Sequence, residues 1–199
     1  GLYKRMIADF ENGITDFRKV TTFNLDEYIG LDINHHESYY SFMNRHLFSH
    51  INISPKRVHL PVGHSDDLQQ ECLAYDTAMK DYQIDLEILG LGTNGHIGFN
   101  EPLTPFDSET HVVDLSSQTR FDNSRFFESL EEVPKQAITM GIASILRAKK
   151  IVLIACGISK ANAIYEMING TVTEQVPATI LQRHPDVVVI LDEDAASKL

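Results

Sequence analysis

The chain has 199 residues, 43% of them hydrophobic and 23% charged, values that are typical of a single globular domain, here residues 1–199. Its formal net charge of −11 argues against nonspecific binding to nucleic acid or to an anionic membrane surface. Two cysteines make no disulfide framework, and the longest apolar run, residues 151–156, is too short to span a membrane, so we predict a cytoplasmic protein with no membrane partner.

Apolar spacing and turn residues predict helices and strands that alternate along the chain. In chain order we expect a helix over 2–12 ended by Gly13, a strand over 19–25, a helix over 37–50, a helix that Ser65 caps and that runs to 82, strands over 84–91 and 111–115, a helix from Pro134 to about Leu146, a strand over 151–155, a helix over 159–168 ended by Gly170, and a strand over 187–191. The last two strands are apolar throughout, which is typical of strands buried on both faces.

Such alternation predicts an α/β fold, a three-layer Rossmann-like domain with a mostly parallel sheet. Residues 116–134 are polar and weakly periodic, and we expect them to form a lid over an active site.

A glycine-rich segment, residues 90–102, follows the predicted strand 84–91 and reads GLGTNGHIGFNEP. Glycines permit positive φ angles and let a ligand approach the backbone closely. Polar groups at the carboxyl end of a strand are typical of sites in open α/β sheets. We therefore predict that His96 transfers protons near neutral pH and that Glu101 orients it.

Other interpretations of this segment fit less well. No Gly-Lys-Ser/Thr follows, which excludes a Walker phosphate loop, and Pro102 and Pro105 stand where a dinucleotide-binding fingerprint needs a helix,. The chain has nine histidines, but their spacing matches no metal motif.

Two neighbouring carboxylates, Asp26 and Glu27, follow the predicted strand 19–25. The plainer interpretation is a solvated strand end with an aspartate that caps a helix. The functional interpretation is a general base, because partial burial in a cleft raises the pKa of an aspartate toward the working range.

Cations occur in two further segments. Arg120 and Arg125 lie beside aromatic residues in 119–127, which is either a solvated helix face or a lid arginine that closes over a phosphate. Lys160 lies in the first turn of the predicted helix 159–168. A cation there opposes the helix dipole unless an anion is bound, so Lys160 favours an anion site.

Together these segments resemble the glucosamine-6-phosphate deaminase family, also called glucosamine-6-phosphate isomerase. The resemblance rests on five motifs: FNLDEY over 23–28, ESYYSFM over 37–43, NGHIGFNEP over 94–102, NSRFF over 123–127, and Ser159-Lys160. It covers the whole chain, and the motif over 94–102 is the most specific of the five.

The resemblance implies conversion of glucosamine 6-phosphate and water to fructose 6-phosphate and ammonia, without a metal or organic cofactor. It implies that His96 assists opening of the sugar ring and that Asp26 moves a proton from C2 to C1. It also implies that Glu101 and Asn94 belong to the catalytic group around His96. Arg125, Lys160 and Gly95 are implied to bind the sugar phosphate.

Two departures from the family accompany these matches. Many members have an aspartate where this chain has Asn94, and an amide can only form hydrogen bonds. The family also begins with a strand and a Thr-Gly phosphate loop ahead of the helix that Gly1 starts here. We therefore expect either that further residues precede Gly1 in the native product or that the chain is a truncated copy.

Alternatives from the same fold are a galactosamine-6-phosphate deaminase/isomerase and a 6-phosphogluconolactonase. A non-catalytic sugar-phosphate sensor and an inactive truncated copy are alternatives from other functional classes. Some bacterial relatives are hexamers activated by N-acetylglucosamine 6-phosphate through basic residues after the histidine loop. The corresponding stretch 106–113 has no Lys or Arg, so we expect a monomer or small homo-oligomer without such activation.

Overall fold

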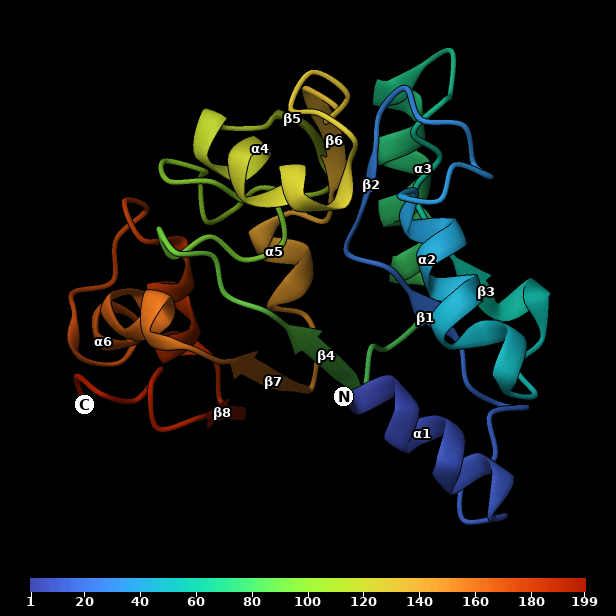
Figure 1. Cartoon of the computed structure of the whole chain (residues 1–199), viewed down its shortest axis with the longest axis horizontal. Helices are drawn as coiled ribbons and strands as arrows, with labels where there is room; N and C mark the ends of the chain where they lie inside the picture. The colour runs from blue at the N-terminus through green and yellow to red at the C-terminus, as the bar shows by residue number, and fades with distance from the viewer.

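Three separate sheets organise the chain in a computed structural model that describes all 199 residues (Figure 1). The strands are β1 (Thr22–Phe23), β2 (Asp26–Tyr28), β3 (Val58–His59), β4 (Leu86–Leu89), β5 (His111–Asp114), β6 (Gln136–Thr139), β7 (Lys150–Ala155) and β8 (Val187–Leu191). The α-helices are α1 (Leu2–Glu11), α2 (Tyr39–His46), α3 (Leu68–Lys80), α4 (Ser117–Asn123), α5 (Ile142–Ile145) and α6 (Ala161–Asn169). Short 3₁₀ helices span Phe48–His50, Pro55–Arg57, Ser124–Phe126, Ile158–Lys160 and Pro177–Arg183.

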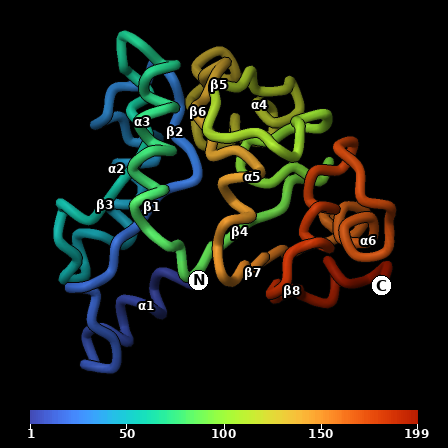
Figure 2. Tube along the Cα trace, turned by 180° about the vertical axis from the view of Figure 1, so that it is seen from behind, coloured from blue at the N-terminus to red at the C-terminus, as the bar shows by residue number.

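The parallel sheet β4-β7-β8 holds the main core, with β7 in the centre. Ile151 and Leu153 of β7 are fully buried, together with Ile164 of α6. Figures 1 and 2 show α6 and β8 on one side of β4, and the segment from β1 to α3 on the other. The α/β class with mostly parallel strands is therefore confirmed.

The expectation that the strand 187–191 is buried on both faces is wrong. Val188 is 40% exposed and Ile190 is 51% exposed, so that exposed and half-buried residues alternate along the strand. The intervening residues Val187, Val189 and Leu191 pack against the core. β8 therefore buries one face only.

A second sheet, β2-β6-β5, is antiparallel and replaces a predicted helix. The helix expected from Pro134 to about Leu146 is wrong: β6 occupies Gln136–Thr139, and only the short α5 follows it. The apolar positions of this stretch fit both periodicities. Pairing with β2 on one side and β5 on the other satisfies the β6 backbone and buries Ala137 and Ile138 completely,.

Helix α3 begins later than its sequence suggests. Asp67, and not Ser65, is the N-cap, since its carboxylate accepts a hydrogen bond from the backbone N–H of Gln70 at 3.0 Å. Cys72, Tyr75 and Met79 form the buried face, as the apolar stripe predicts. No helix combines the length and the apolar character needed to cross a membrane.

Candidate active site

One cavity of about 1020 Å³ brings predicted site residues together from distant parts of the chain. Asp26, His96, Arg125 and Lys160 all line it. β1 and β4 also line this cavity, and each pairs with a neighbouring strand on one side only. A single cavity therefore holds the two candidate proton-transfer groups and both candidate phosphate ligands.

Asp26 begins β2 and is paired in register with Thr139 of β6. Its side chain reaches the cavity but is otherwise surrounded by protein atoms. This burial, reinforced by the charge of Glu27, raises the pKa of Asp26 to about 7. A carboxylate with such a pKa is both available and basic near neutral pH, which suits a general base.

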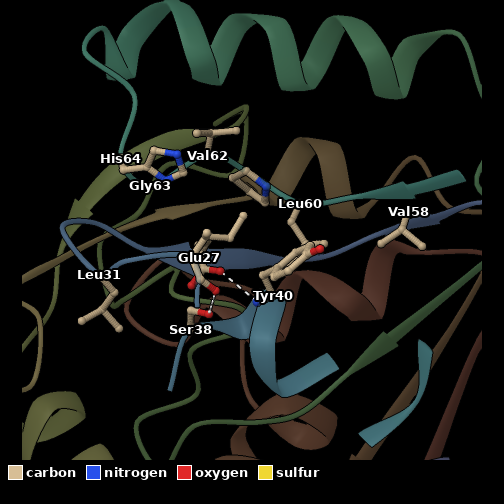
Figure 3. A pocket seen from close by; sticks show the side chains of 11 residues that line it. Glu27, Leu31, Ser38, Tyr40, Val58, Leu60, Val62, Gly63 and His64 are labelled. Carbon is tan, nitrogen blue, oxygen red and sulfur yellow. Dashed lines mark hydrogen bonds between the residues drawn. The ribbon is translucent and has the colours of Figure 1, made fainter. Parts of the chain in front are cut away.

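Glu27 points the other way, as successive residues of a strand do. It lines a second cavity of about 180 Å³, where Figure 3 shows it beside Ser38 and Tyr40. The Glu27 carboxylate accepts hydrogen bonds from the backbone N–H groups of Tyr28 and Tyr39 at 2.9 Å and of Tyr40 at 3.0 Å. Glu27 therefore ties the start of α2 to the strand that carries Asp26, a role that the sequence pattern did not indicate.

Glycines allow the histidine loop to pack tightly. A Cβ on Gly92 would lie 2.3 Å from the His96 imidazole ring. Gly98 has a φ of +58°, and a Cβ there would lie 3.0 Å from Thr139 Oγ1 and 3.8 Å from Asp26 Oδ2. These two positions bring His96 and Asp26 to the same cavity, and side chains at either would push the loop away.

Glu101 lies behind His96 and is held by groups from two segments. Its Oε2 accepts a hydrogen bond from Asn94 Nδ2 at 2.8 Å, and its Oε1 accepts one from Thr119 Oγ1. His96 Nδ1 is 3.7 Å from Oε2, too far for a hydrogen bond, and has no other partner,. Burial alone would raise the pKa of Glu101, but the neighbouring groups of His96, Thr119 and Asn94 outweigh it and lower that pKa to about 2.

Glu101 is thus an anion that faces the histidine. Asn94 also accepts a hydrogen bond from the His96 backbone N–H at 3.2 Å through its Oδ1. Thr119 was missed by the sequence pattern, because nothing local in a short helix indicates a contact with a residue 18 positions away.

Two cations, Arg125 and Lys160, line the cavity. Arg125 lies in the 3₁₀ turn after α4 with its guanidinium carbon 4.7 Å from the Phe126 ring centroid. Lys160 precedes α6; burial lowers the pKa of Lys160, the charge of Asp122 opposes this effect, and the charge of Arg125 adds to it. The positive charges of Arg125 and Lys160 repel one another. A phosphate dianion bound between them would offset this repulsion.

Gly95 lies just outside the cavity lining. It has a φ of +84°, and a Cβ there would lie 2.4 Å from Val176 Cγ1. Its carbonyl accepts a hydrogen bond from the Ala178 N–H at 2.9 Å. The structure contains no group of three or more His, Cys, Asp or Glu side chains arranged to hold a metal ion.

A further buried carboxylate, Glu87 of β4, lines the same cavity and is 7% exposed. Burial raises the pKa of Glu87 to about 8, helped by the charge of Asp26 and opposed by the backbone N–H of Ile88. The Glu87 carboxyl loses its proton at lower pH in the unfolded chain than in the folded one. Glu87 therefore lowers the free energy of unfolding increasingly as the pH rises from about 4.5 toward 8,.

We therefore expect Glu87→Gln to leave stability nearly unchanged at pH 4.5 and to raise the free energy of unfolding at pH 8 by on the order of 3 kcal/mol. Urea denaturation at the two pH values measures the difference. Glu132→Gln, at an exposed position, is the matched control and should show no such pH dependence. A stability gain for Glu87→Gln that is the same at both pH values would contradict the raised pKa.

Known proteins resemble this chain in sequence and in fold. The family model of glucosamine-6-phosphate isomerases and 6-phosphogluconolactonases matches residues 1–190. The chain is similar to the glucosamine-6-phosphate deaminase of Clostridium novyi, with 52% identity over 200 residues that cover 100% of this chain and 83% of the relative. It is also 54% identical to the glucosamine-6-phosphate deaminase of Thermoanaerobacter pseudethanolicus over 198 residues, 99% of this chain and 78% of the relative.

Solved structures extend the comparison. A monomeric glucosamine-6-phosphate deaminase of the NagB superfamily superposes with a TM-score of 0.97 at 44% identity, covering 100% of this chain and 83% of that structure. A 6-phosphogluconolactonase from Trypanosoma brucei superposes with a TM-score of 0.72 at 17% identity, over 99% of this chain and 81% of that structure. The second similarity is one of fold alone.

Proposed function

This chain belongs to the family of glucosamine-6-phosphate isomerases and 6-phosphogluconolactonases, and we propose that it converts glucosamine 6-phosphate and water to fructose 6-phosphate and ammonia. The observation that carries the proposal is the cavity in which Asp26 and His96 face the same space as Arg125 and Lys160. Relatives at 50–54% identity are glucosamine-6-phosphate deaminases, whereas the lactonase similarity concerns the fold only.

In the proposed mechanism His96 transfers a proton at the ring oxygen and opens the pyranose. Asp26 then removes the proton from C2 of the open chain while the aldehyde oxygen gains a proton, which gives a cis-enolamine. Asp26 returns its proton at C1, and the amine nitrogen gives up one proton. The product of this step is a ketimine at C2, and water hydrolyses it to a ketone and ammonia. Glu101, an anion behind His96, stabilises the protonated histidine between these steps.

Arg125 and Lys160 are proposed to bind the phosphate. Phosphate binding at this end of the substrate fixes the sugar relative to Asp26 and His96, and fixed geometry is a large part of the rate of a proton transfer. None of these steps is assigned to a metal or organic cofactor.

We expect the protein to release ammonia from glucosamine 6-phosphate in the presence of EDTA, because side chains alone perform each proposed proton transfer. A coupled ammonia assay measures the rate, with galactosamine 6-phosphate and 6-phosphogluconolactone as parallel substrates. Ammonia from the first substrate and no hydrolysis of the lactone are the expected results. Lactone hydrolysis without ammonia release would reverse the assignment within the family.

We also expect hyperbolic kinetics that N-acetylglucosamine 6-phosphate does not alter. Residues 106–113 contain no Lys or Arg. The cations that do reach this stretch, Lys80 and Arg147, are already 3.0 and 3.1 Å from Glu109 Oε1. A phosphate dianion would therefore meet a neutralised or acidic surface.

Rate-against-substrate curves with and without the acetylated sugar phosphate test this expectation. A sigmoidal curve that the effector makes hyperbolic would contradict it. The related solved deaminase is monomeric, and we propose that this chain is a monomer or a small homo-oligomer, which light scattering coupled to size exclusion measures.

A further inference from the structure

Thr119 connects the predicted lid to the candidate catalytic carboxylate. It belongs to α4, is 4% exposed and lines the main cavity. Its Oγ1 donates a hydrogen bond to Glu101 Oε1, while the other carboxylate oxygen is held by Asn94 at 2.8 Å. Each oxygen of Glu101 therefore has one donor, and the two donors come from different segments of the chain.

Ser116 fixes the direction of the Thr119 hydrogen bond. Ser116 Oγ lies 3.0 Å from Thr119 Oγ1 and donates to it, and the same oxygen caps α4 by accepting the Thr119 backbone N–H at 3.1 Å. The single hydroxyl proton of Thr119 is therefore directed at Glu101, which as an anion can only accept. The result is a chain of hydrogen bonds, in which each bond polarises the next.

We propose that Thr119 is a positioning residue for the reaction, which holds the Glu101 carboxylate in the orientation that faces His96. The inference rests on the proposed function. His96 Nδ1 is 3.7 Å from Glu101 Oε2 and has no hydrogen-bond partner, so a rotation of the carboxylate takes this oxygen away from the histidine. Thr119 opposes that rotation from the side opposite Asn94.

The proposal also gives α4 a specific role. Since the Thr119 hydroxyl reaches Glu101 only while α4 lies against the histidine loop, the orientation of the catalytic carboxylate depends on the placement of this helix. His96 is the titratable side chain that lies against Glu101; Thr119 and Asn94 are neutral. A change in the pKa of Glu101 therefore reports a change in its contacts with His96, Thr119 or Asn94.

Thr119→Val keeps the shape of the side chain and removes its donor, while Thr119→Ser keeps the donor. We expect Thr119→Val to lower kcat by about 10- to 100-fold with KM changed less than about threefold, because the phosphate ligands are untouched. Thr119→Ser should recover most of the lost kcat. Equal kcat values for wild type and Thr119→Val would overturn the proposal.

A readout that needs no substrate is the titration of the Glu101 carboxyl carbon by NMR, assigned by its disappearance in Glu101→Gln. Loss of one donor should raise the pKa of Glu101 in Thr119→Val and leave it near the wild-type value in Thr119→Ser. An unchanged titration in Thr119→Val would overturn the proposal, whatever its activity. If Thr119→Val does not fold, Thr119→Ala removes the same donor.

Gln118→Gly separates this role from the stability of the helix, because it lowers helix propensity at an exposed position of α4 and leaves the Thr119 hydroxyl with both of its hydrogen-bond partners,. It should lower the melting temperature and retain most of kcat. A loss of kcat as large as that of Thr119→Val would assign the effect to helix stability and overturn the proposal. A wild-type protein that releases no ammonia would instead refute the proposed function.

Discussion

Asp26→Asn is expected to lower the rate of ammonia release by about a hundred- to ten-thousand-fold, the usual effect of removing a general base. An amide keeps the shape of the side chain but cannot accept the C2 proton. Solvent deuterium exchange at C2 measures the proton transfer directly and should fall by the same factor. Phosphate binding, measured with an unreactive sugar phosphate, should persist, since Arg125 and Lys160 are unaltered.

Asp114→Asn is the matched control, because Asp114 is an exposed aspartate of the same antiparallel sheet. Its activity should equal that of wild type. Unchanged deuterium exchange in Asp26→Asn would assign the base to another residue. The pKa of about 7 for Asp26 adds a pH signature: the base works only when ionised, so the wild-type rate should rise with pH through about 7.

Gly92→Ala is expected to lower kcat by on the order of a hundredfold, because the added methyl group would lie 2.3 Å from the His96 ring and must displace it,. The backbone at Gly92 is not left-handed, so the substitution acts through this collision and not through φ. Steady-state kinetics measure the loss.

Thr93→Ala provides a control in the same loop. Thr93 is next to Gly92 in the chain but does not line the cavity. Thr93→Ala should therefore remain nearly as active as wild type, with thermal melting to show that both variants are folded. Equal kinetics for the two variants would mean that the His96 ring position does not limit the reaction.

Local signals account for what the sequence predicted well. The strand before Gly90 and the glycine-rich loop around His96 are read from a few adjacent residues, and the structure places Gly92 and Gly98 of this loop at the cavity. The helix α1 and the buried stripe of α3 are also read from the spacing of nearby apolar residues, and the structure contains both. Each of these features is decided by short-range spacing, which a single sequence displays.

Long-range pairing accounts for what the sequence could not show. Residues 136–139 have apolar positions that suit a helix or a strand, and only pairing with β2 and β5 decides between them,. Thr119 and Glu27 act on groups that folding brings to them, so their types and neighbours in the chain carry no signal. The opposed orientations of Asp26 and Glu27 likewise depend on β2 being a strand at all,.

The pairing of β2 with β6 has a consequence for the order of folding. Asp26 lies opposite Thr139, about 110 positions later, and a loop of that size must close before the pair contributes any stabilising contact. Helices α3 and α6 need no such closure and can form from neighbouring residues. A refolding chain therefore regains helical structure before β2 pairs with β6 and positions Asp26. Recovery of catalytic activity then reports the final stage of folding.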